Sequence, residues 1–136
     1  MTESPTFSWP IRVYWEDTDA GGVVYYANYL KFLERARTEW LSSLGLEQDR
    51  LAGEAGVVFV VRRVEADYLK PARFNDRLTI HCDLAELGRA SLVMRQQVFR
   101  GDERLLAAVV RVACVEYRSF RPARIPDFVT QVLPTP

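Results

Sequence analysis

The stretch NYLKFLERARTEWLSSL, residues 28–44, decides the fold of this chain, because its apolar side chains recur at helical spacing. Gly45 follows directly and is a typical C-terminal stop for a helix. A helix this apolar is more plausibly wrapped by a sheet than laid on a surface. The apolar positions are three or four residues apart, and Leu30 and Leu41 widen the face that they form: Tyr29, Phe32, Leu33, Ala36, Trp40 and Leu44.

Strand-like segments lie on both sides of this helix. Before it, residues 7–15 carry apolar side chains at alternate positions, and Pro10 indicates an edge strand or a bulge. After it come four further segments and no second long helix. Their expected ranges are Val57–Leu69, Leu78–Leu87, Ala90–Phe99 and Arg104–Arg118, with a tight hairpin turn at residues 100–103. The order predicts a single α+β domain over residues 1–136, a five-stranded antiparallel sheet wrapped around one long central helix.

Composition and charge exclude several classes of protein. The 136 residues include 18 basic and 18 acidic side chains, so we expect neither nucleic acid nor an anionic membrane as the main partner. The first residues lack the pattern of a signal peptide, and the longest apolar run, Leu105–Val110, is too short to cross a bilayer. Cys82 and Cys114 are expected to be reduced and buried. These features predict a cytoplasmic protein without a transmembrane segment.

The strongest candidate site is the stretch from Trp15 to Tyr29, WEDTDAGGVVYYANY. It places a carboxylate after a strand, then small residues, then the start of the apolar helix. The first N–H groups of a helix have no internal partner and carry partial positive charge, so they stabilise an oxyanion or a polarised carbonyl. A carboxylate beside them could attack a thioester or activate a water. The alternative is purely structural: an aspartate that caps the helix, and glycines that only form a turn.

The chain also resembles a known family. Residues 9–40, WPIRVYWEDTDAGGVVYYANYLKFLERARTEW, are similar to the family that includes 4-hydroxybenzoyl-CoA thioesterase and the Tol–Pal-associated acyl-CoA thioesterase, and closer to the latter branch. Weaker similarity continues through residues 59–62, 68–75 and 88–93. The resemblance implies the hotdog fold, assembly into homodimers or homotetramers, and hydrolysis of acyl-CoA. Coenzyme A would be part of the substrate, with no separate cofactor, and an acyl carrier protein is a further candidate partner.

Site residues follow from the same resemblance. It makes Asp19 the catalytic carboxylate and the backbone N–H of Tyr26 the donor to the thioester carbonyl. Nearer relatives commonly have histidine where Tyr26 stands, which leaves the backbone role intact. Gly22 would let the substrate approach the backbone closely. Arg89 and Ser91 match positions that hold the phosphates and pantetheine of the coenzyme, although a solvated surface arginine would look the same.

Other sites are less well supported. His81 is the only histidine, and one histidine with two distant cysteines does not make a metal site. A serine–histidine triad through Ser91 lacks a nucleophile elbow, and a dehydratase would need a histidine at the helix. A non-catalytic thioester-binding or scaffold protein of the same fold stays open. Arg62 shares an apolar strand face, so it either pairs with a helix carboxylate or marks a change of register.

Overall fold

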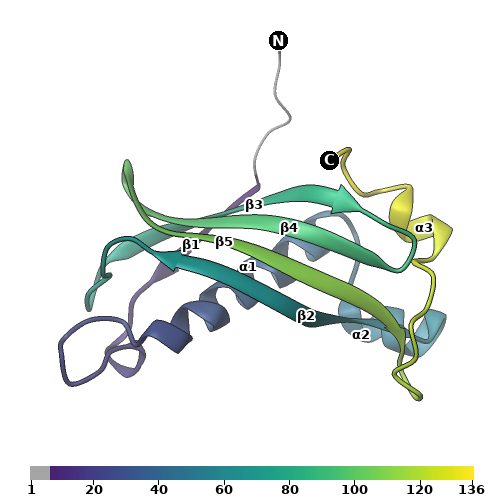
Figure 1. The fold of residues 1–136 in the computed structure, drawn as a ribbon, viewed down its shortest axis with the longest axis horizontal. Coiled ribbons are helices and arrows are strands. Elements are labelled where there is room, and N and C mark those ends of the chain that lie inside the picture. Colours follow the sequence, from purple (N-terminus) through teal and green to yellow (C-terminus); the bar gives the residue numbers. More distant parts are fainter. Residues whose placement is uncertain (1–6) are drawn as a thin grey trace, which may run out of the picture.

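The computed structural model describes residues 7–136. Residues 1–6, on which part of the expected absence of a signal peptide rests, lie outside this range. Five strands and one long helix form the fold (Figure 1). The strands are β1 (Phe7–Arg12), β2 (Val57–Tyr68), β3 (Arg77–Leu87), β4 (Ser91–Arg100) and β5 (Glu103–Glu116); the helices are α1 (Tyr29–Ser43), α2 (Gln48–Arg50) and α3 (Asp127–Thr130). Shorter helical turns span Trp15–Asp17, Tyr26–Asn28 and Leu51–Ala55.

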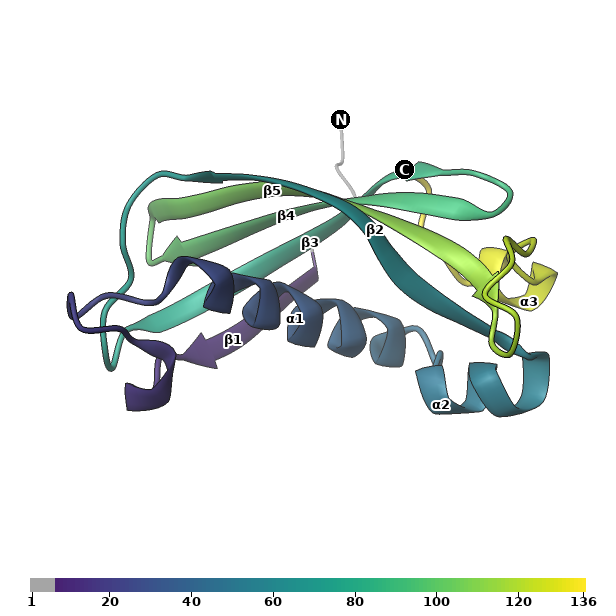
Figure 2. The same ribbon diagram turned by 60° about the horizontal axis from the view of Figure 1, so that its bottom comes forward.

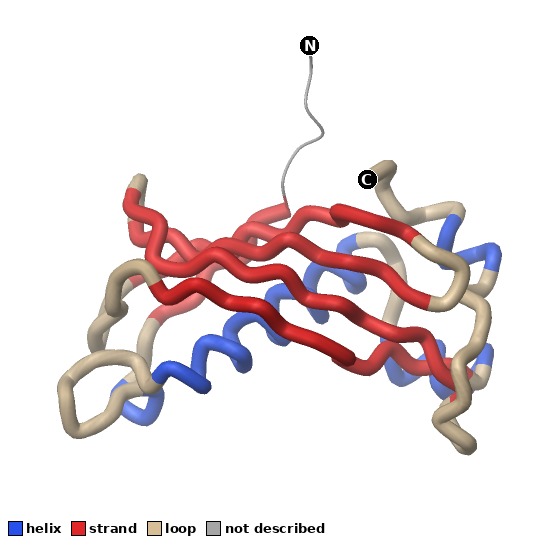
Figure 3. The backbone as a smooth tube through the Cα atoms, viewed as in Figure 1, coloured by secondary structure: helices blue, strands red, loops and turns tan. Residues whose placement is uncertain are grey.

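The strands make one antiparallel sheet in the order β1-β3-β4-β5-β2. Figure 3 shows the strands side by side, with the helices on one side and at the end of the sheet. β1 and β2 are therefore the two edges. Pro10 lies within β1, and an edge strand tolerates a missing N–H, so the expected edge strand is confirmed.

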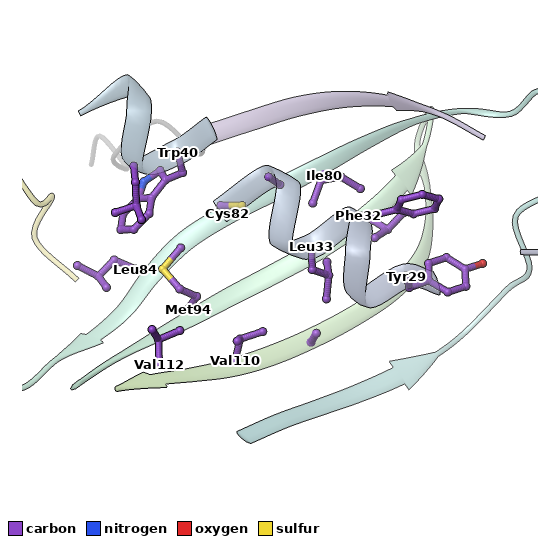
Figure 4. Close-up of a cluster of buried hydrophobic side chains, with 14 of the residues drawn as sticks. Tyr29, Phe32, Leu33, Trp40, Ile80, Cys82, Leu84, Met94, Val110 and Val112 are labelled. Carbon is purple, nitrogen blue, oxygen red and sulfur yellow. The ribbon is translucent and has the colours of Figure 1, made fainter. Parts of the chain in front are cut away.

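Helix α1 lies along the concave face of the twisted sheet (Figure 2). Its buried side chains Tyr29, Phe32, Leu33, Ala36, Trp40 and Leu41 pack against inward-facing residues of the strands. Figure 4 shows Ile80, Cys82 and Leu84 of β3, Met94 of β4, and Val110 and Val112 of β5 around the helix. The expected five-stranded sheet around one central helix is confirmed.

Several details differ from the expectation. The first strand ends at Arg12 rather than at Trp15, because a helical turn closes where the Asp17 N–H donates to the Tyr14 carbonyl at 3.0 Å. Leu30 does not widen the buried face of α1 and is 41% exposed. The remaining element boundaries shift by one or two residues.

Arg62 marks a change of register, one of the two alternatives for its position. β2 and β5 pair regularly up to Val61 and again from Arg63, with Arg62 as the extra residue of a bulge. The bulge turns Arg62 out to solvent, and it makes no ion pair within residues 7–136.

Both cysteines are free and buried, as expected. Among the described residues, no helix is both long enough and apolar enough to cross a bilayer.

Candidate active site

A short hairpin presents Asp19. The Asp19 N–H donates to the Val23 carbonyl, and the Gly22 N–H donates to the Asp19 carbonyl, both at 3.0 Å. Gly22 has a φ of +78°, a backbone conformation that side chains disfavour. A turn followed by a left-handed glycine is a common three-residue hairpin connection. Gly22 thus has a conformational reason to be glycine, independent of the expected approach of a substrate.

The Asp19 carboxylate is exposed and locally held. Its Oδ1 accepts a hydrogen bond from the Gly21 N–H at 2.8 Å, and a Cβ added at Gly21 would come within 3.2 Å of the same oxygen. The second carboxylate oxygen is left for other partners. No side chain caps either Tyr26–Asn28 or α1, so the capping alternative does not describe Asp19.

Asp17 has the structural role instead. It is only 5% exposed, and its carboxylate accepts from the Tyr14 N–H at 2.8 Å and from the Asn28 side-chain amide at 2.9 Å. The Tyr25 N–H also donates to the Asp17 carbonyl. Asp17 therefore fastens the turn after β1 to the residues that begin the helix. Sequence reasoning missed this role.

Tyr26 begins the helical path that continues into α1. Within residues 7–136 its N–H donates to no backbone acceptor, as expected for the first residue of a helical turn. The segment with Asp19 pairs with the segment before Tyr26, through the bridge between Thr18 and Val24. The pKa of the neighbouring Tyr25 phenol is raised, chiefly by the Tyr26 hydroxyl and also by the Asp19 carboxylate. The hairpin thus joins the segment that carries the Asp19 carboxylate to the segment that leads into the Tyr26 N–H.

A cavity of about 280 Å³ lies beside Tyr26. Its walls come from Val24, Tyr26 and Tyr29 before and at the start of α1, and from the end of β2 and the residues after it, Tyr68, Leu69, Lys70 and Pro71. Asp19 lies outside these walls. Sequence reasoning missed Tyr68, whose hydroxyl donates to the Tyr26 carbonyl at 3.0 Å, because the contact joins residues 42 positions apart.

Arg89 and Ser91 lie far from Tyr26 in the same chain. Tyr68 of β2, which contacts Tyr26, pairs with Leu106 of β5, and Leu106 pairs with Val98 of β4. Val98 therefore marks the level of Tyr26 along β4. Ser91 begins β4 seven residues earlier, about 23 Å away at the rise of a strand. Arg89 instead lines a cavity with Arg124 near α3.

His81 and Ser91 are also separated. His81 pairs with Gln97, six residues from Ser91 and about 20 Å along β4. The serine–histidine alternative is therefore wrong for a single chain. Within residues 7–136, no group of three or more histidine, cysteine, aspartate or glutamate side chains could hold a metal ion.

Comparison with known proteins gives consistent results. A sequence profile of the thioesterase superfamily matches residues 21–107. The chain is 43% identical over 123 residues to the acyl-CoA thioesterase YbgC of Haemophilus influenzae, covering 90% of each chain. It is 45% identical over 124 residues to the acyl-CoA thioester hydrolase YbgC of Escherichia coli O6:H1, covering 90% of this chain and 92% of that one. The crystal structure of a probable thioesterase from Bartonella henselae superposes with a TM-score of 0.86 at 37% identity, covering 90% and 100% of the two chains.

Proposed function

This chain belongs to the thioesterase superfamily and is a thioester hydrolase with the hotdog fold, and on that premise we propose that it cleaves acyl-CoA with Asp19 and the Tyr26 amide. The observation that carries the proposal is the hairpin between Asp19 and Val23. In this hairpin the Asp19 carboxylate is exposed and one of its oxygens accepts from the Gly21 N–H. The segment that carries Asp19 pairs with the residues just before Tyr26, whose N–H donates to no backbone acceptor among the described residues.

In the proposed reaction, the thioester oxygen accepts a hydrogen bond from the Tyr26 N–H, where the helix dipole favours the developing negative charge. Two routes follow. In one, an Asp19 oxygen attacks the carbonyl carbon, the coenzyme leaves as a thiolate that takes up a proton, and water hydrolyses the resulting anhydride. In the other, Asp19 removes a proton from a water that attacks the carbonyl. Both routes require the ionised carboxylate and yield a free acid and coenzyme A.

We propose further that the enzyme works as a homodimer or a homotetramer in which two subunits are joined along β2. This strand has 12 residues without proline and forms an edge of the sheet, whereas the other edge contains Pro10. A long edge strand without proline can pair with a second strand. Antiparallel pairing of two β2 strands would bring the start of one beside the end of the other, next to Tyr68.

Such pairing supports a role for Arg89 and Ser91. Two strand spacings separate β4 from β2, and a third separates β2 from its copy, about 14 Å in total. Ser91 of the partner subunit would then lie that far across the sheet from Tyr68, within the reach of the long pantetheine arm. We therefore propose that Arg89 and Ser91 contact the coenzyme across subunits.

The cellular location and the protein partners of the enzyme are proposed as the sequence analysis led us to expect them. We propose a cytoplasmic enzyme, supported by two buried free thiols. Association with the Tol–Pal system and transfer from an acyl carrier protein are proposals that co-purification tests. The non-catalytic scaffold is the competing function, and a turnover assay separates the two.

The decisive experiment measures thiol release from a panel of acyl-CoA substrates by wild type and Asp19→Asn. We expect Asp19→Asn to stay folded, to bind substrate and to lose kcat by about 10²–10⁴-fold. Glu16→Gln is the matched control, because Glu16 is an exposed carboxylate in the adjacent turn. Equal turnover by Asp19→Asn and wild type would overturn the assignment, and no turnover by wild type would favour the scaffold.

A further inference from the structure

A second cavity, of about 130 Å³, lies between the later half of α1 and the sheet. Its apolar walls come from the end of α1 and from β2, β4 and β5: Trp40, Leu41, Phe59, Val61, Leu92, Met94 and Val112. Four polar side chains complete the lining: Glu34, Arg37, Thr38 and Gln48. None of these residues belongs to the Asp19 hairpin or to the cavity beside Tyr26.

Arg37 is the unusual member of this wall. Its Nη1 donates to Gln96 Oε1 at 3.0 Å, and Gln96 is itself completely buried. The Gln96 amide nitrogen donates in turn to the Leu33 carbonyl and to the Cys82 sulfur, at 3.0 and 3.1 Å. This chain of contacts holds the guanidinium over the core, and burial lowers the pKa of Arg37.

The Arg37 charge lacks a close carboxylate. No acidic group within residues 7–136 comes within 4.0 Å of it. Glu34 is the only acidic residue in the lining, and its Oε1 accepts from the Thr38 hydroxyl at 2.9 Å. All fully buried side-chain nitrogens among the described residues have partners, so the other two Arg37 nitrogens are accessible to solvent or to a ligand. A partly buried cation with free donors favours an anionic ligand.

Both cavities lie along the same side of α1, toward β2. Arg37 comes 11 residues after Tyr26 on the helical path, about 16 Å along its axis. The apolar side chains Leu30 of α1 and Val61 of β2 are exposed by 41% and 47% in the single subunit and lie on this side, next to the edge along which a second copy is proposed to pair. An extended acyl chain could therefore reach from the reacting carbonyl to the second cavity.

We propose that this cavity receives the far end of the acyl group, and that Arg37 selects chains that end in a carboxylate. The inference rests on the proposed thioesterase function, and it names ω-carboxyacyl-CoA as the preferred substrate class. The apolar walls contact the methylene chain, and the free guanidinium donors bind the terminal carboxylate. Glu34 opposes this binding by its negative charge.

The test compares ω-carboxyacyl-CoA and plain acyl-CoA substrates of equal chain length, from short to long. We expect wild type to prefer the carboxylate-ended member among the long chains only. Arg37→Met should lower kcat/KM for that member by roughly tenfold to a hundredfold, as expected for a lost charge-assisted hydrogen bond, and leave short acyl-CoA unchanged. Glu34→Gln keeps an acceptor for Thr38 and should change the same parameter in the opposite direction.

Opposite effects of the two variants would support the proposal. No preference in wild type, or equal losses on both substrate types in Arg37→Met, would overturn it. If Arg37→Met unfolds, Glu34→Gln still decides, because an unchanged kcat/KM for carboxylate-ended chains contradicts the proposal. Binding of the free long-chain dicarboxylic acid to wild type, by calorimetry, tests the cavity without turnover. An enzyme that hydrolyses no acyl-CoA but binds this acid would contradict the proposed function and not the cavity.

Discussion

The Asn28 side-chain amide donates a 2.9 Å hydrogen bond to the buried carboxylate of Asp17. The contact joins the turn after β1 to the residue that directly precedes α1, and it holds the Asp19 hairpin between them. Neither residue needs to touch a substrate for this contact to affect activity.

Asp17→Ala should therefore destabilise the protein. The Tyr14 N–H and the Asn28 amide both lose their acceptor, and loss of hydrogen bonds to a buried charged group costs about 1.5–3 kcal/mol. Urea unfolding measures the loss, with Glu16→Ala as an exposed control in the same turn. Equal stability of the two variants would contradict the structural role of Asp17.

Gly22→Ala should lower both stability and turnover. A side chain at a φ of +78° costs of the order of 1–3 kcal/mol, and relief of that strain would displace Asp19. Thermal unfolding and kcat are the measurements. Gly53→Ala is the control, because Gly53 is exposed, lacks a positive φ and has open space around its Cα. A fully active and stable Gly22→Ala protein would show that the hairpin does not set the carboxylate position.

Tyr68→Phe should slow catalysis more than it affects folding. It removes only the hydroxyl that donates to the Tyr26 carbonyl, a contact worth about 0.5–1.5 kcal/mol. We expect kcat to fall by up to about tenfold, with little change in melting temperature. Tyr117→Phe is the control, since that ring is exposed on the loop after β5. An unchanged kcat would mean that Tyr68 does not position the amide.

The Cys82 thiol should resist thiol reagents in the folded protein. Burial raises its pKa from 9.0 to about 11, although the hydrogen bond from Gln96 and the charge of Arg37 act in the opposite direction. The unfolded chain therefore loses this proton first, so the thiol's contribution to stability falls as the pH rises from about 9 toward 11. Labelling of a Cys114→Ala protein with Ellman's reagent at pH 8 measures the reactivity. Fast labelling without unfolding would contradict a buried, protonated thiol.

Hydrogen exchange should distinguish the two edges of the sheet. If β2 pairs with a second copy, amides of β2 that do not bond to β5 should be protected, while amides on the free side of β1 exchange rapidly. Mass spectrometry of backbone exchange measures both edges in one experiment. Equal rapid exchange at both edges would contradict pairing through β2.

The periodicity of the sequence was sufficient for the fold. Apolar side chains at helical spacing identified α1, and alternation with turn residues identified all five strands, because these patterns reflect which side chains face the core. The hairpin at residues 100–103 was also predictable, and Gly101 in its turn has a positive φ of 61°. Element boundaries were predicted less accurately where a side chain replaces strand pairing as a hydrogen-bond partner of the backbone. The Asp17 carboxylate does this when it accepts from the Tyr14 N–H, and β1 ends at Arg12.

The site was only partly predictable. Local spacing was enough to put Asp19 and Gly22 in one hairpin that leads into the helix start at Tyr26, because a hairpin needs only a few adjacent residues. Tyr68 and the contact between Arg37 and Gln96 depend on pairs 42 and 59 positions apart, for which one sequence holds no signal. The separation of Arg89 from Tyr26 likewise follows from the pairing of β2, β5 and β4 rather than from any local pattern.

The bulge at Arg62 has a consequence for changes of chain length. Phe59 and Val61 before it, and Val64 and Ala66 after it, pair with the same alternate positions of β5. A deletion of Arg62 alone would leave those four side chains in perfect alternation, still facing α1. Because residue 63 is also arginine, a deletion of Arg63 gives the same chain, whereas a deletion of Phe59, Val61, Val64 or Ala66 would remove one of these inward-facing side chains. The Arg62–Arg63 pair is thus the place in this part of β2 where the chain can shorten by one residue and keep all four inward-facing side chains in position.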